Sequence, residues 1–135
     1  MPMQVELVSP EKILWSGEAE MVITRTVGGG DIAFLPGHAP FVGALGIGAM
    51  TIRPTDGPDE HVAVHGGFVE VSGNPERGTT VTILSDVAEM QDHIDYDRAV
   101  QAKEQAEAQL RHEHDGQIEA QLRRAEVRLE VHARP

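Results

Sequence analysis

Two arginines near the end of the chain are the first candidates for chemistry. Arg124 and Arg128 stand four residues apart, so on a helix they face each other as like charges, and neither has an acidic neighbour at helical spacing. Such a pair is stabilised when an anion is supplied from elsewhere, either a nucleotide phosphate or an acidic loop of a partner. We predict an anion-binding role for them, with solvated surface arginines as the alternative. Arg123 differs, because Glu119 and Glu126 lie at pairing distance along the same helix.

A second charged group lies at Asp95 and Arg98, where a helical pattern begins. A carboxylate at this position caps a helix N-terminus by accepting a backbone hydrogen bond, and Arg98 follows as its partner three residues on. Capping explains Asp95 without any ligand, so two interpretations remain open: a structural cap, or part of a binding site.

The sequence offers no recognisable catalytic array. The chain has seven histidines, but His38, His61 and His65 show neither H-x-H nor HExxH spacing, and no GxSxG or GxxxxGK[ST] motif is present. His112 and His114 are two residues apart and so lie on different helix faces. We expect solvated or hydrogen-bonding histidines, no metal site and no catalytic residue.

Short strands must position most of these groups. Residues 3–8 alternate polar and apolar side chains, and similar short runs follow at 12–19, 20–26, 32–35, 48–53, 61–64, 68–71 and 79–84. Turn signals such as Asn74-Pro75 separate them. About eight to ten short strands indicate an antiparallel β-sandwich or barrel. We assign residues 1–90 to this domain.

The last part of the chain, residues 91–135, has helical spacing instead. One apolar stripe consists of Ala99, Ala102, Ala106 and Leu110, and a second of Ile118, Leu122, Ala125 and Leu129. Asp115-Gly116 separates the stripes, which predicts an antiparallel two-helix hairpin. Because alanine contributes a single methyl group to a contact, we expect the hairpin to be held weakly enough to leave its docked position and extend. A permanently closed hairpin is the alternative.

Composition excludes several classes of function. The net charge of −11 argues against nucleic acid and against anionic lipid, since both need a basic surface. The chain has no cysteine, so it forms no disulfide and no thiolate metal site. The opening residues lack the pattern of a signal peptide, and no window approaches the roughly 18 apolar residues of a membrane span. We therefore expect membrane association through a partner alone.

The stretch from Gly28 to Gly48 combines bends with apolar residues. It contains Gly28-Gly29-Gly30, Pro36 and Pro40, which favour turns, beside apolar side chains such as Phe34 and Phe41. A stretch this apolar must pack against something. We predict a strand at residues 32–35 and a rigid loop carrying His38, which is either an interface residue or an ordinary loop histidine. The apolar side chains form a docking surface for another protein unless the chain's own fold buries all of them.

The quoted residues carry a resemblance to a known family. GDIAFLPGHAPFVGAL at residues 30–45 and GGFVEV at 66–71 resemble the epsilon subunit of the bacterial F-type ATP synthase, and the likeness extends over residues 3 to about 131. The resemblance implies a flattened sandwich of about ten strands followed by the hairpin. It also implies a non-catalytic subunit that couples the gamma subunit to the proton-driven c-ring and inhibits ATP hydrolysis through its helices.

The resemblance assigns site residues to three surfaces. A gamma and c-ring interface is implied for Asp31, Phe34, Leu35, Pro36, Gly37, His38, Pro40, Phe41 and Leu45. A regulatory ATP site is implied at an I/L-D-x-x-R-A motif and nearby charges, namely Glu89, Ile94, Asp95, Arg98, Ala99, Arg124 and Arg128, with Gln105 where the family has an arginine. Inhibitory contacts with the alpha/beta catalytic head are implied for Arg123, Arg124 and Arg128.

No cofactor is required in this interpretation, and ATP would act as a regulatory ligand. The implied location is the cytoplasmic face of the bacterial membrane, as a peripheral protein. Two rival hypotheses remain: a stand-alone ATP-binding sensor, and an enzyme built on a sandwich scaffold, which lacks the HxH…E cluster of cupin-like metal proteins.

Overall fold

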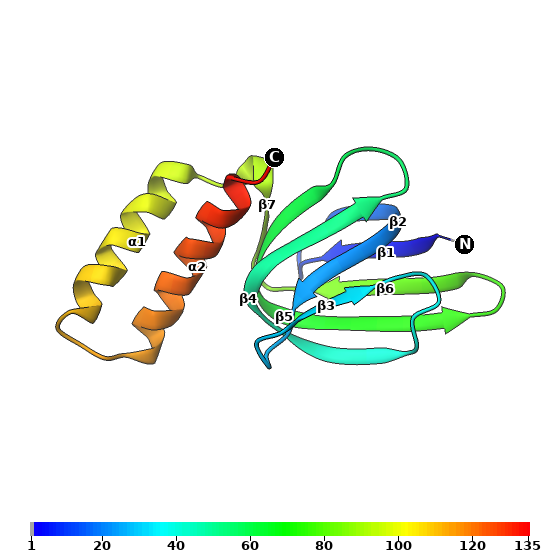
Figure 1. The fold of residues 1–135 in the computed structure, drawn as a ribbon, viewed down its shortest axis with the longest axis horizontal. Coiled ribbons are helices and arrows are strands. Elements are labelled where there is room, and N and C mark those ends of the chain that lie inside the picture. The colour runs from blue at the N-terminus through cyan, green and yellow to red at the C-terminus, as the bar shows by residue number, and fades with distance from the viewer. Residues whose placement is uncertain (1) are drawn as a thin grey trace.

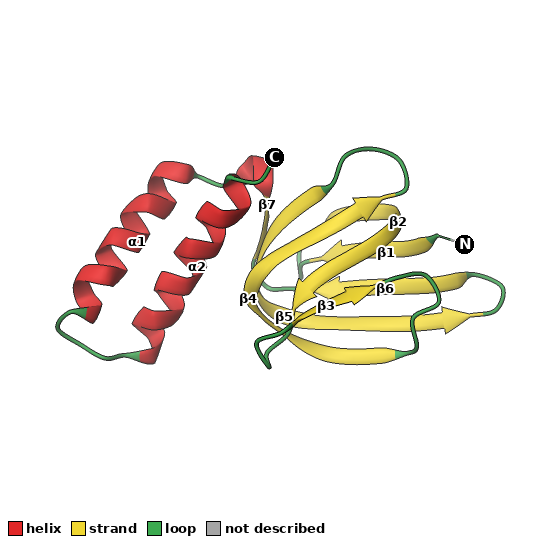
Figure 2. Ribbon diagram, in the orientation of Figure 1, coloured by secondary structure: helices red, strands yellow, loops and turns green. Residues whose placement is uncertain are grey.

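The computed structural model describes residues 2–135 as a β-domain followed by a helical hairpin (Figure 1, Figure 2). The strands are β1 Met3–Val8, β2 Ile13–Arg25, β3 Asp31–Phe34, β4 Phe41–Pro54, β5 Glu60–Asn74, β6 Gly78–Leu84 and β7 Ala88–Met90. A short 3-10 turn, η1 Gln91–His93, leads into α1 Tyr96–Leu110 and α2 Gly116–His132. The predicted order, a β-rich domain and then two helices, is confirmed.

The strands form one sheet that closes on itself. Its order is β1-β6-β5-β4-β2-β3, with β7 paired to β5, and β1 also pairs with β2. The closure leaves few free strand edges, and the two layers enclose a core. Phe34, Met3, Leu7, Met50 and Ile52 are the largest side chains in that core, and all are fully buried.

Two details of the strand prediction are wrong. The described residues form seven strands, not about ten, because the runs read as separate strands at 12–19 and 20–26 join into β2, and β4 and β5 are likewise continuous. The sheet is also not wholly antiparallel, since β1 pairs with β6 in parallel, for example Val5 with Val81.

The first helix begins after Asp95, as predicted, and the second begins at the predicted break, where Gly116 is its first residue. The Asp95 side chain accepts a hydrogen bond from the backbone N–H of Arg98, and the Asp115 side chain accepts one from Gln117. These are N-cap bonds, which satisfy backbone donors that the first helical turn leaves free. The chain turns back between Leu110 and Gly116, so α1 and α2 lie side by side (Figure 1).

The hairpin docks on the sheet through α2, which lies between α1 and the strands (Figure 1). Val127 and Val131 are fully buried against Ala63 of β5 and Ile94. These two valines form a second apolar face of α2, which the spacing did not identify. The predicted stripe that ends at Leu129 lies on a different side of the helix.

Polar contacts fix the end of α2. The Gln91 side-chain amide donates to the carbonyl oxygens of Val131, at 2.9 Å, and of Arg134, at 2.5 Å. Arg134 in turn donates to the Thr51 hydroxyl at 2.9 Å. Because each bond joins the tail to the β-domain or its connecting turn, they hold the hairpin in its docked position.

Candidate functional site

Glu89 joins the β-domain to the hairpin. It lies in β7, opposite Ala63 of β5, so its side chain leaves the sheet on the face that α2 covers. One carboxylate oxygen of Glu89, Oε1, accepts a hydrogen bond from Arg128 Nε at 2.6 Å and another from His65 Nε2 at 2.9 Å. Arg128 comes from α2 and His65 from β5, and we call these three residues the clasp.

Arg128 pairs with an anion, as its spacing predicted, but the anion comes from the chain itself and not from a partner. That anion is Glu89, from the same chain and 39 residues away in sequence. Arg123 behaves differently from its prediction: within residues 2–135 it forms no ion pair with Glu119 or Glu126, so local pairing was wrong for it.

The hydrogen bond from His65 and then the guanidinium of Arg128 hold the pKa of Glu89 below its ordinary value of 4.5, against the opposing effect of partial burial. A carboxylate whose pKa is lowered by folding stabilises the folded state at neutral pH. This contribution is complete above about pH 4.5 and disappears as the pH falls through the lowered pKa.

We predict that Glu89→Gln removes this pH dependence. The difference in thermal stability between wild type and Glu89→Gln should be largest at neutral pH and shrink on acidification below about pH 4.5. Thermal unfolding followed by circular dichroism at a series of pH values measures it. Glu104→Gln, on the exposed face of α1, is the matched control and should show no such trend. An equal difference at every pH would contradict the prediction.

A cavity of about 570 Å³ lies beside the clasp, between β7 and the two helices. Its lining residues are Val87, Glu89, His93, Asp95, Arg98, Ala99, Ala102 and Arg128. The cavity therefore brings together five of the residues assigned to the nucleotide site, with carboxylates and guanidiniums on its walls. Val87, His93 and Ala102 also line it, and sequence reasoning did not select them for this site.

A smaller cavity of about 200 Å³ lies between the helices, and Ala102 and Arg128 belong to both cavities. Arg124 lines this second cavity, with Gln105 on its wall. Ile94 lines neither one: it packs with Val127 and Val131, so its place in the motif is accounted for by hairpin docking.

The predicted docking loop lies at another part of the β-domain. His38 packs edge-on against Phe34, with ring centroids 5.0 Å apart, and near Phe41 at 6.2 Å. The backbone N–H of Gly37 donates to the Thr79 hydroxyl at 2.7 Å, which ties the loop to β6. A concave surface of about 560 Å³ lies here, lined by Pro36 to Pro40 and by the β5–β6 turn.

The structure divides the residues predicted for this interface. Leu35, Pro36, Gly37 and Pro40 are exposed, His38 and Phe41 are half-buried, and Asp31 is exposed and 3.7 Å from Arg25. Phe34 and Leu45 are core residues, so including them in a docking surface was wrong. Their apolar character serves the β-domain itself.

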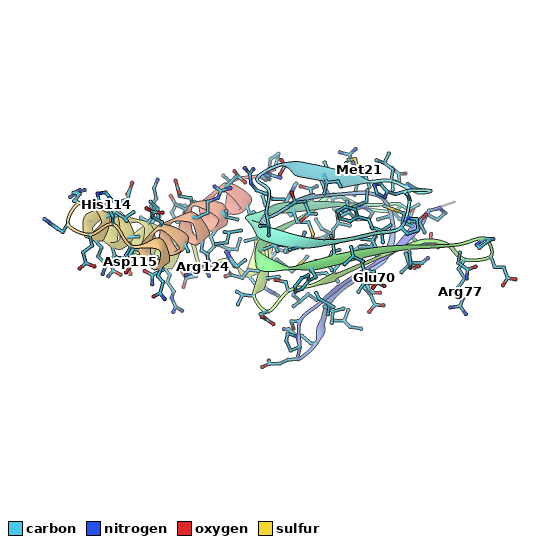
Figure 3. The ribbon with its side chains drawn as sticks, turned by 90° about the horizontal axis from the view of Figure 1, so that it is seen from below. Met21, Glu70, Arg77, His114, Asp115 and Arg124 are labelled. Atoms are coloured by element: carbon cyan, nitrogen blue, oxygen red, sulfur yellow. The ribbon has the colours of Figure 1, made fainter. Side chains whose placement is uncertain are left out.

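A surface that the sequence did not suggest crosses the outside of the sheet. Strand pairing places Ala44 opposite Phe68, Phe68 opposite Leu84, Leu84 opposite Val8, and Val8 opposite Ile13. We call these five residues the apolar row. Phe68 is 61% exposed and Leu84 is 51% exposed. Acidic Glu70 follows two residues after Phe68 in β5 and so lies on the same face; Figure 3 labels Glu70 on the outside of the sheet. The signal available in the sequence was strand register, which periodicity alone does not fix.

The fold and these surfaces define a small binding subunit, a closed β-domain with a docked helical hairpin. Among residues 2–135 no helix is long and apolar enough to cross a bilayer. The family model for the β-sandwich domain of the ATP synthase delta/epsilon chain matches residues 2–91, and that for its long α-helix domain matches residues 92–132. The chain therefore belongs to the ATP synthase delta/epsilon chain family.

Individual relatives agree with this assignment. The chain is 42% identical over 127 residues to an ATP synthase epsilon chain of Streptomyces avermitilis, covering 94% of this chain and 92% of the relative. It is also 42% identical over 131 residues to one of Bacillus pumilus, covering 95% of each.

Solved structures share the fold at lower identity. A chain of the Euglena gracilis mitochondrial ATP synthase (OSCP/F1/c-ring) matches with a TM-score of 0.71 and 22% identity, covering 97% of this chain and 77% of that one. A chain of the Tetrahymena thermophila mitochondrial ATP synthase, central stalk and c-ring, matches with a TM-score of 0.63 and 20% identity, covering 96% and 93%.

Proposed function

We propose that this chain is a non-catalytic central-stalk subunit of a bacterial F-type ATP synthase, joining the gamma subunit to the c-ring at the cytoplasmic face of the membrane. The observation that carries the proposal is the apolar row, in which Phe68, Leu84 and Ile13 are each more than half exposed on the β-domain. In a family whose relatives are named ATP synthase epsilon chain, a stalk partner is the natural occupant.

Two surfaces divide the work in this proposal. The apolar row would bind the gamma subunit, because aromatic and aliphatic side chains dominate the buried centre of stable interfaces. The exposed part of the Pro36–Pro40 loop would contact the c-ring, since hydrogen bonding and ring packing hold the loop rigid. The hairpin would inhibit ATP hydrolysis when it leaves the β-domain and extends towards the catalytic head.

Reconstitution tests the function directly. Adding the purified chain to membranes depleted of this subunit should restore proton-coupled ATP synthesis and lower ATP hydrolysis. Restoration of neither activity would contradict the proposal. The result does not depend on whether the chain binds nucleotide.

The apolar row predicts a specific defect. Phe68→Gln should weaken binding to the depleted enzyme about 10- to 100-fold, since an aromatic residue at an interface centre contributes about 2 kcal/mol or more. Because Phe68 is already exposed, the unfolding free energy of the isolated chain should change by no more than about 0.5 kcal/mol. Titrated reconstitution measures the affinity.

Tyr96→Gln is the matched control for Phe68→Gln, because Tyr96 is an aromatic residue half exposed on α1, outside the apolar row. It should leave binding to the depleted enzyme unchanged. Equal affinities for the Phe68 variant and the wild type would exclude the apolar row as the gamma surface.

We further propose that the larger cavity holds ATP as a regulatory ligand while the hairpin is docked. Its volume is that of an ordinary small-molecule site, and Arg98 and Arg128 on its wall would meet phosphate groups. A nucleotide touching β7 and both helices would favour the docked hairpin and oppose inhibition. No hydrolysis of this ATP is implied.

Removing one of these guanidiniums should weaken ATP binding. Arg98→Gln is expected to lower affinity about 10- to 100-fold, because a hydrogen bond to a charged group contributes about 1.5–3 kcal/mol. Calorimetry of the isolated chain with MgATP measures it, and Arg123→Gln, which changes a residue lining neither cavity, is the control. Tight binding by a chain that copurifies with no stalk or ring subunit would favour the stand-alone sensor instead.

A further inference from the structure

His65 has no role in the functions described so far, yet it occupies a buried and partly unpaired position. Its side chain is 2% exposed, beneath the contact between Glu89 and Arg128. Nε2 lies 2.9 Å from Glu89 Oε1, while Nδ1 is buried and has no hydrogen-bond partner among residues 2–135. A polar atom buried in this way is unusual, because burial without a partner is unfavourable.

The contact with Glu89 decides which ring nitrogen of His65 is the donor. The carboxylate of Glu89 is ionised and can only accept, so His65 Nε2 carries the proton and donates it.

The same oxygen of Glu89 receives both donors. A glutamate side chain has three rotatable bonds and, at a partly exposed site, samples several rotamers. The hydrogen bond from the buried His65 restricts Glu89 to one rotamer. Arg128 of α2 then donates to the same oxygen at 2.6 Å. The bond from His65 thus prepares the acceptor that the hairpin uses.

We propose that His65 is a positioning residue: by donating from Nε2 it aims Glu89 at Arg128 and so strengthens the docking of the hairpin. The effect on docking is a property of the isolated chain. The regulatory role of His65 rests on the proposed release of the hairpin. In that case a residue of β5 helps to determine how readily the inhibitory helices undock from the β-domain.

Hydrogen exchange of the full-length chain tests the proposal. His65→Met introduces an apolar side chain of similar length without an N–H donor, and should speed exchange of the α2 amides about tenfold relative to those of β6. His65→Gln keeps an N–H group near the position of Nε2 and should restore α2 protection to within about twofold of the wild type. In an Arg128→Met background, His65→Met should have no further effect on α2.

Several outcomes would overturn the proposal. These are unchanged α2 exchange in His65→Met, failure of His65→Gln to restore it, or a full His65→Met effect in the Arg128→Met background. A general loss of packing would speed exchange in β6 as well and would persist without Arg128, so the comparison separates the two causes.

A spectroscopic measurement needs no substitution at His65. Nitrogen NMR of the wild-type chain should show His65 protonated at Nε2, and Glu89→Gln should shift the Nε2 signal. Finding the Nδ1–H tautomer in the wild type would overturn the proposal. The stalk function is tested by reconstitution of the complex, so failure of one proposal is distinguishable from failure of the other.

Discussion

Gly67→Ala should destabilise the β-domain by about 3–5 kcal/mol, combining backbone strain with overpacking. Gly67 has a φ of +137°, which residues with a side chain rarely adopt, and a methyl group there would lie 2.1 Å from the carbonyl oxygen of Leu84. That oxygen belongs to the backbone of the neighbouring strand, so it cannot swing aside as a side chain would. Urea denaturation followed by circular dichroism measures the loss.

Gly73 offers a control within the same strand. An added methyl group would meet no atom within 4 Å at this position, and its φ is ordinary. Gly73→Ala should therefore change the unfolding free energy by less than about 1 kcal/mol. Similar denaturation midpoints for the two variants would show that β5 can relax around Gly67.

Gly67 also explains why strand counting from the sequence went wrong. Before Gly67, the even-numbered Val62 and Val64 of β5 face the core of the β-domain. After Gly67, the odd-numbered Val69 and Val71 face it instead. Positive-φ glycines at 66 and 67 reverse the alternation without ending the strand. A pattern of period two must stop at such a point, so one bent strand reads as two short ones.

The other long strands show the same reversal. In β2, the odd-numbered Ala19 is buried, and after it the even-numbered Val22 and Thr24 are buried. The pairing with β4 shifts register between Ala19 and Met21. Strands that bend in this way serve both layers of the closed sheet. The sequence therefore predicts the β-domain and most strand positions, while continuity depends on partners that are distant in sequence.

For the candidate site, too, the sequence predicts local features but not the contacts between distant segments. The Asp95 cap and the unpaired state of Arg124 and Arg128 within α2 follow from local spacing. The identity of the anion at Arg128 does not, because Glu89 reaches it only when α2 docks beside β7. His65 was equally hidden, since no motif marks a histidine whose partner lies 24 residues away across a strand pair.

Val127→Asp should release the hairpin while the β-domain stays folded. Val127 is fully buried, and the side chains of its cluster, Ala63, Ile94 and Val131, are all apolar. Burying an unpaired charge is unfavourable by several kcal/mol. The few apolar side chains at this contact contribute about 1.5–3 kcal/mol each when fully buried, so the α2–sheet contact should open to hydrate the carboxylate.

Val127 does not belong to the core of the β-domain. The strands should therefore keep their protection from hydrogen exchange while α2 loses its protection. Ala108→Asp introduces the same charge on the exposed side of α1 and should leave α2 protected.

The absence of cysteine allows a spin-label pair, introduced on exposed residues of β5 and α2, to report the separation directly. In the reconstituted complex, a hairpin that cannot dock should inhibit ATP hydrolysis more strongly than the wild type, and added ATP should no longer relieve that inhibition. Full protection of α2 in Val127→Asp would mean that the polar bonds of Gln91 and Arg134, together with the clasp, hold the hairpin without the apolar contact.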